Sequence, residues 1–96
     1  MTIESYNKAT DLLRTRRWLE EIRDDYEKAA RMIRESPEDA ILDNSSIAIR
    51  TGVRTGIVDL NCHRPVKCGG LLQAFEAAAA SIKDEIDEID KEIAAL

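Results

Sequence analysis

The chain has 96 residues, a formal net charge of -5, and 44% hydrophobic but only 4% aromatic residues. This length allows one domain with a thin aliphatic core, and it leaves no room for a catalytic domain beside a regulatory one. The acidic balance excludes a general nucleic-acid binder, which would carry a basic face. We therefore expect residues 1–96 to form a single domain that does not bind nucleic acid directly.

The cysteine content and the N-terminus indicate where the protein works. Only two cysteines occur, Cys62 and Cys68, whereas small secreted domains are usually rich in disulfides. The N-terminus does not combine a basic segment with an apolar run and a cleavage site. The uncharged stretch 68–75 is too short to cross a bilayer. We expect a cytoplasmic protein that makes no membrane contact.

Residues 3–35 predict one long helix, either unbroken or bent near residues 14–17. The segment is rich in helix-forming residues and contains neither glycine nor proline. Apolar side chains recur along one side of it, at Leu12, Leu19, Ile22, Tyr26, Ala29 and Ile33. This side should pack against another element.

The residues that follow have the features of a second helix start. Ser36 offers a capping hydroxyl, Pro37 suits the first helical position, and two acids stand in the first turn. We therefore predict a short helix over residues 37–42.

Residues 45–63 have the pattern of a β-hairpin with one apolar face. Ile47 and Ile49 alternate with small or polar residues, and so do Val58, Leu60 and Cys62 further on. The connecting residues contain glycine and hold the only internal repeat of the chain, in which RTGV from residue 50 is followed at once by RTGI from residue 54. The repeat brings two Arg-Thr pairs close together in the sequence.

The last segment has the clearest pattern. Its apolar residues alternate three and four positions apart, at Leu72, Phe75, Ala79, Ile82, Ile86, Ile89, Ile93 and Leu96. This spacing predicts a helix over residues 71–95 with a coiled-coil seam. The predicted fold class is mainly α: an antiparallel two-helix coiled-coil hairpin joined by a short β-hairpin. Because Trp18, Met32, Leu13 and the run 77–80 fall off the seam, we expect a homo-oligomer, with a compact monomer as the alternative.

The residues that could carry chemistry do not form a catalytic or metal-binding pattern. Cys62, His63 and Cys68 are possible zinc ligands, but the two cysteines are separated by five residues and a fourth ligand is missing. A cysteine nucleophile would need a histidine base and a third group that orients it. We expect free thiols, no metal, no cofactor and no enzymatic activity.

Charge is distributed unevenly along the chain. Residues 45–70 carry 4 basic and 1 acidic side chains, against 8 and 11 in residues 1–44 and 2 and 7 in residues 71–96. Either hairpins simply hold fewer carboxylates than helices do, or the basic segment binds an anion. The candidate ligand-binding residues are Arg50, Thr51, Arg54, Thr55, His63, Arg64 and Lys67, with Trp18 as an aromatic able to stack on a base.

Two glycines next to this segment add a second possible anion contact. Gly69 and Gly70 precede the last helix, so backbone N–H groups at its positive end could face an anion. In the alternative interpretation the glycines only let the chain turn, and the arginines pair with acids of a neighbouring subunit.

Two resemblances concern the layout of the chain. Residues 2–13, the strand Ile47-Ala48-Ile49 and the closing helix of isoleucines and acids resemble small phage-encoded proteins with a helix, hairpin, helix pattern. Some small helical oligomers of phages act as sponges for cyclic nucleotides of bacterial immune signalling, in the CBASS and Thoeris pathways. This resemblance implies a stoichiometric binder in the host cytoplasm. The order of elements also resembles the β-type prefoldin subunit, which implies a role in assembly or in capturing unfolded protein.

The sequence therefore predicts a non-enzymatic homo-oligomer that sequesters a small anionic ligand, with a cyclic nucleotide immune signal as the first choice. The alternative from a different class is a protein-binding inhibitor that turns its acidic helices toward a basic partner. A prefoldin-like chaperone or assembly protein is a further alternative.

Overall fold

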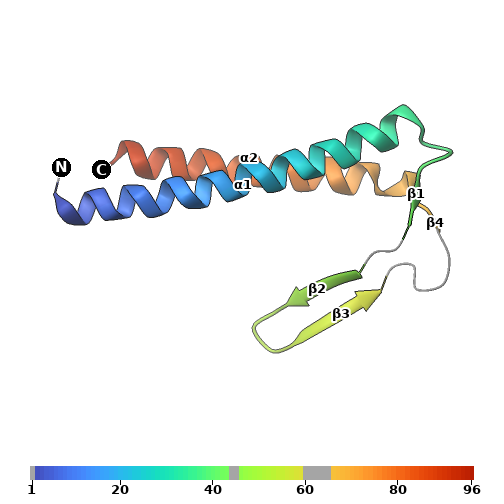
Figure 1. Cartoon of the computed structure of the whole chain (residues 1–96), viewed down its shortest axis with the longest axis horizontal. Helices are drawn as coiled ribbons and strands as arrows, with labels where there is room; N and C mark the ends of the chain where they lie inside the picture. The colour runs from blue at the N-terminus through green and yellow to red at the C-terminus, as the bar shows by residue number, and fades with distance from the viewer. Residues whose placement is uncertain (1, 44–45, 60–65) are drawn as a thin grey trace.

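The computed structural model describes residues 2–43, 46–59 and 66–96. Within these ranges, two long helices, α1 (Ile3–Glu35) and α2 (Leu72–Ala94), are joined by four short strands and a single 3-10 turn, η1 (Gly69–Leu71). The strands are β1 (Ile41–Leu42), β2 (Ser46–Arg50), β3 (Thr55–Asp59) and β4 (Val66–Lys67). The helices run antiparallel, with both chain ends together at one end of the pair and β1 and β4 at the other (Figure 1). The predicted mainly helical fold is confirmed.

The bounds of the two long helices follow from local chemistry. Thr2 caps α1, since its hydroxyl oxygen accepts a hydrogen bond from the Ser5 backbone N–H at 3.0 Å. The helix then continues without a break to Ser36, where the backbone leaves the helical region at φ -145° and ψ 66°. The predicted helix over residues 3–35 is confirmed as one unbroken element, and the helix predicted over 71–95 is observed at 72–94.

The apolar stripe predicted on α2 faces inward at all but its last position. Its apolar residues from Leu72 to Ile93 are buried or half-buried, whereas Leu96 is exposed. On α1 the buried stripe differs from the prediction at several places. Ile22 is exposed while Arg23 is half-buried, and Ala30, which was not predicted, is among the most buried residues. The apolar stem of Arg23 can cover the seam while its guanidinium reaches Asp24 and Glu27.

The core formed by this packing is small. Among the described residues, five hydrophobic side chains are buried: Ala30, Ile33, Cys68, Ala79 and Ile86. The rings of Tyr26 and Phe75 add a contact between the helices, with centroids 6.1 Å apart. The radius of gyration is 17.4 Å, against about 12.5 Å for a compact domain of this length. The molecule is therefore elongated and has little interior.

The short helix predicted over residues 37–42 is wrong. The Ser36 carbonyl accepts from the backbone N–H groups of Asp39 and Ala40, which makes one turn that does not continue. Residues 41–42 instead form β1, which pairs antiparallel with β4 in the register Ile41↔Lys67. Pairing with a distant segment therefore overrides the local signals for a helix start.

The predicted β-hairpin is confirmed in its described part. β2 and β3 pair antiparallel, with Ile47 opposite Val58 and Arg50 opposite Thr55. A four-residue turn, 51–54, closes the hairpin, and the Thr51 backbone N–H donates to the Arg54 carbonyl at 2.8 Å. The remaining residues of the predicted 45–63 segment, which are 45 and 60–63, lie outside the described residues.

Candidate functional site

The β2–β3 hairpin, residues 46–59, extends away from the helix pair; we call it the hairpin arm. It runs back alongside the helices, with β2 as the nearer strand and an open space between (Figure 1). Its only charged residues are Arg50 and Arg54 near the turn and Asp59 at the other end. The end of the arm is thus a positively charged point on an acidic protein.

The strand register divides the arm into two faces. Residues directly opposite each other share a face, and side chains alternate along a strand. Ile47, Ile49, Gly56 and Val58 therefore lie on one side, the Ile49 face. Arg50, Thr55 and Ile57 lie on the other, the Ile57 face.

The two predicted arginines of the arm do not lie on the same face. Arg50 is opposite Thr55 on the Ile57 face. Arg54 lines a shallow hollow together with Ile49 and Val58, so it belongs to the Ile49 face. The repeated RTG sequence therefore presents its two guanidinium groups in different directions, and the expected cluster of two arginines is not formed within one arm.

The two predicted threonines also have different surroundings. The hydroxyl oxygen of Thr51 accepts from the backbone N–H groups of Val53 and Arg54, at 3.2 and 3.1 Å, and its hydroxyl donates to the Arg54 carbonyl at 3.2 Å. Thr51 therefore holds the turn together. Thr55 is exposed in β3, beside Arg50, and its hydroxyl is better placed to meet a ligand.

Two more of the predicted ligand-binding residues, Lys67 and Trp18, lie away from the end of the arm. Lys67 lies in β4, at the strand end of the helix pair (Figure 1). Trp18 lies near the middle of α1 and is 56% exposed. His63 and Arg64 lie outside the described residues.

One of the two glycines before α2 has a structural explanation. A Cβ added to Gly69 would lie 2.6 Å from the carbonyl oxygen of Pro37, whereas one added to Gly70 would meet nothing within 4 Å. Gly69 is therefore required where the turn after α1 approaches the start of α2. This close approach gives Gly69 a structural role, whereas the anion contact at the start of α2 stays a prediction.

Some arginines on the helices, namely Arg14, Arg16, Arg23 and Arg34, have acidic partners, whereas Arg17 and Arg31 have none among the described residues. Arg34 Nη2 lies 3.0 Å from Glu76 Oε1 across the two helices, and Arg16 contacts both Glu20 and Asp90. A hydrogen bond to Asp90 raises the pKa of Arg16 above its ordinary value. Within the described parts of the chain, neither Arg50 nor Arg54 forms an ion pair.

An apolar hollow at the strand end of the helix pair, which we call the end hollow, was not predicted. It has a volume of about 540 Å³, and Glu35 and Asp39 add carboxylates to its lining. Its main apolar lining residues are Met32, Ile33, Ile41, Leu42, Cys68 and Phe75. The one signal in the sequence was that Met32 falls off the predicted seam. The hollow itself could not be predicted, because α1, β1 and α2 build it together.

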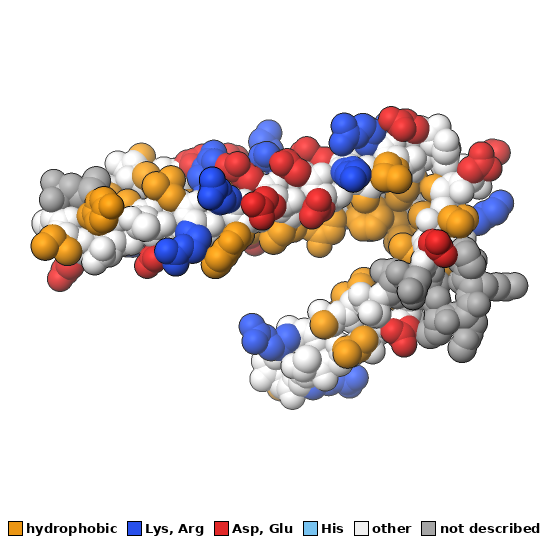
Figure 2. Space-filling view, viewed as in Figure 1, with side chains coloured by type: hydrophobic (Ala, Val, Ile, Leu, Met, Phe, Trp, Pro, Cys, Tyr) orange, Lys and Arg blue, Asp and Glu red, His pale blue; other side chains and the backbone are white. Residues whose placement is uncertain are grey.

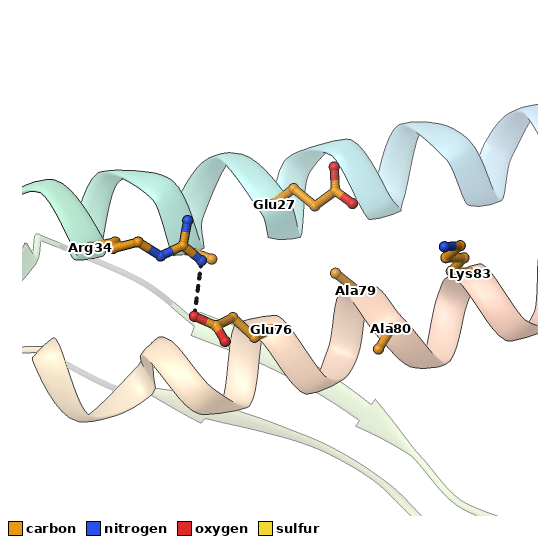
Figure 3. A pocket seen from close by; sticks show the side chains of 7 residues that line it. Glu27, Arg34, Glu76, Ala79, Ala80 and Lys83 are labelled. Atoms are coloured by element: carbon orange, nitrogen blue, oxygen red, sulfur yellow. Dashed lines mark hydrogen bonds and ion pairs between the residues drawn. The ribbon is translucent and has the colours of Figure 1, made fainter.

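Two further hollows follow the groove between the helices. One, of about 350 Å³, lies over Ala30, Ala79 and Ala80, and the Arg34–Glu76 ion pair crosses it (Figure 3). Its charges are balanced, since Glu27 and Lys83 line it as well. The other, of about 470 Å³, is acidic; it is lined by Thr15, Leu19, Ser81, Asp84, Glu85, Glu88 and Ile89.

No group of three or more histidine, cysteine or carboxylate side chains in the described ranges could hold a metal ion; Cys62 and His63 lie outside these ranges. Neither α1 nor α2 combines the length and the apolar character needed to cross a bilayer.

No protein-family model matches the chain, and comparison with curated proteins and with solved structures finds no significant match.

Proposed function

We propose that the protein is a non-enzymatic homo-oligomer that sequesters a small phosphorylated ligand, with a cyclic nucleotide as the first choice, at the end of its hairpin arm. The observation that most directly supports the proposal concerns Arg50. Its side chain is exposed on the Ile57 face beside Thr55, and it has no acidic partner in the described part of the chain. A guanidinium group suits phosphate because its N–H groups match two oxygens at once.

The arrangement of the arm assigns different roles to the candidate residues. Directly opposite residues on two strands have Cβ atoms about 5 Å apart, so Arg50 and Thr55 can contact one phosphate together. Arg54 adds positive charge from the opposite face, and Thr51 supports both by holding the turn. We further propose that the two helices wind around each other as a coiled coil, in keeping with the spacing of their apolar residues. We also propose that the protein works in the cytoplasm, in keeping with the phage-like layout.

The test is titration calorimetry with a panel of cyclic dinucleotides, cyclic trinucleotides and cyclic ADP-ribose isomers. We expect Arg50→Ala to weaken binding of the preferred nucleotide by roughly 10- to 150-fold, since a hydrogen bond to a charged group contributes about 1.5–3 kcal/mol. Arg31→Ala is the matched control, because it removes an exposed arginine from α1. Mass spectrometry of the recovered nucleotide should show it unmodified.

Two results would contradict this proposal. If wild-type protein binds no member of the panel, the ligand class is wrong. If Arg50→Ala binds as tightly as Arg31→Ala, the ligand does not sit on the Ile57 face.

A second candidate function is binding of a basic protein, and the acidic hollow between the helices favours it. Asp84, Glu85 and Glu88 line this hollow together with the apolar side chains of Leu19 and Ile89. A basic partner would then bind strongly at low salt and weakly at high salt. Reversing Glu85 and Glu88 to Lys should abolish such binding, whereas Arg50→Ala should leave it unchanged; the opposite result would exclude this candidate.

A further inference from the structure

We propose that two copies of the chain form a two-fold dimer in which the Ile49 face of each hairpin arm packs into the end hollow of the other copy. This inference deepens the proposed function, because it states how copies associate. It depends on the self-association that the proposed function includes, and it does not depend on which ligand the protein binds.

The hairpin arm needs a packing partner. An isolated two-stranded hairpin is marginally stable at best in water and usually requires a further strand or a helix against its apolar face. Yet Ile47, Ile49 and Val58 on the Ile49 face are 44, 49 and 46% exposed. In Figure 2 apolar side chains are visible both on the arm and along the helix pair, with open space between. The arm therefore presents an apolar surface that its own helices leave uncovered.

The accessible surface of the chain is large enough to supply a dimer interface. It measures 7731 Å², whereas a compact monomer of 10.8 kDa exposes about 5,500 Å². The difference of about 2,200 Å² exceeds the roughly 800 Å² per partner that a standard stable interface buries. The chain therefore exposes more than enough surface for a standard dimer interface with a second copy.

The two surfaces match in chemistry as well as in area. The Ile49 face combines aliphatic side chains with one cation, since Arg54 lines the same hollow as Ile49 and Val58. The end hollow combines apolar walls with two carboxylates, those of Glu35 and Asp39. Docking would bury the aliphatic residues and bring Arg54 to acids that it does not contact within its own chain.

Symmetry makes the contact reciprocal. If the arm of one copy occupies the hollow of the second, the arm of the second occupies the hollow of the first, and the assembly closes as a dimer. The Ile57 face, with Arg50 and Thr55, then remains outside the contact. The two halves of the RTG repeat would serve different purposes: Arg50 for the ligand and Arg54 for association.

The first experiment is sedimentation equilibrium of the full chain without ligand. Wild-type protein is expected at twice 10.8 kDa, and Ile49→Asp at the monomer mass. Ile57→Asp is the matched control, because it places the same charge on the opposite face of the same arm, and it should stay dimeric. Met32→Asp changes the hollow from the helix side and should also give a monomer.

The outcomes separate this inference from its rivals. A wild-type protein that sediments at the mass of one chain would overturn the dimer. The same mass is expected if the arm closes on its own helices, so that arrangement is excluded by a dimeric wild type. Dimeric Ile49→Asp and Met32→Asp proteins would show that the copies meet elsewhere. Circular dichroism of each variant should show unchanged helix content, because Met32 is exposed and the arm lies outside the helices.

A charge exchange tests the pairing itself. Arg54→Glu should raise the dimer dissociation constant at least about tenfold, since it brings like charges together. Adding Glu35→Arg and Asp39→Arg should restore association. Arg50→Glu is the matched control and should leave the dimer intact. Failure to restore association would overturn the pairing of Arg54 with Glu35 and Asp39. The effect of Arg50→Ala on nucleotide binding tests the proposed function alone and does not bear on the dimer.

Discussion

Ile86 on α2 and Ile57 on the hairpin arm show how differently the two regions are built. Ile86 is 3% exposed in the seam between the helices, whereas Ile57 is 74% exposed. The helix pair is held by side chains that meet across it, including the Arg34–Glu76 and Arg16–Asp90 pairs. The arm is held by its backbone ladder and by the hydroxyl of Thr51. Stability therefore resides in the helix pair, and surface free for recognition resides in the arm.

The largest expected effect comes from removing a seam side chain. Ile86→Ala should lower the free energy of unfolding by about 3 kcal/mol, because it deletes buried methyl groups and leaves a cavity. Ile57→Ala should change it by less than about 0.5 kcal/mol. Urea unfolding followed by circular dichroism measures both. Equal losses would mean that the arm contributes to the core, and the contrast between the regions would not hold.

An intermediate effect is expected at the joint between the two regions. Gly69→Ala should destabilise the protein by about 1–3 kcal/mol, because the added methyl group meets the Pro37 carbonyl oxygen at 2.6 Å. Gly70→Ala is the control, since a Cβ there meets nothing within 4 Å. Thermal unfolding of the two variants should separate them by several degrees. Identical unfolding curves would show that the turn after α1 moves freely from the start of α2.

The smallest effect should be confined to the arm. Thr51→Val removes the hydroxyl that holds the turn and should favour opening of the arm by about 1 kcal/mol. Hydrogen exchange at the β2 and β3 amides should speed up, while the α2 amides stay as protected as before. Thr55→Val, in the strand, should change neither. If α2 amides also exchange faster in Thr51→Val, the arm and the helices unfold together.

The helices could be predicted because their signals are local and periodic. The alternating spacing from Leu72 to Ile93 and the lack of breakers in residues 3–35 predict the observed elements closely. The short helix failed for the opposite reason. Its start signal at Ser36 and Pro37 is local, but β1 is set by pairing with β4, a two-residue strand too short to show any periodicity.

The candidate site was predictable in composition but not in geometry. Basic residues in the middle of the chain pointed to the arm, where Arg50 and Arg54 lie. The face on which each arginine lies depends on the turn, because a four-residue turn sets Arg50 opposite Thr55. The end hollow could not be predicted from the sequence, because residues that are far apart in it, from Ala29 to Phe75, combine to form the hollow.

The molecule measures 55 × 34 × 16 Å, so its shortest dimension is less than a third of its longest. Most described positions consequently tolerate exchange as far as folding is concerned, because only five of them are buried hydrophobic residues. Sequences that keep the seam spacing and Gly69 could diverge almost everywhere else and still adopt this shape. The arm, least constrained by packing within the chain, is where such divergence would most readily change specificity.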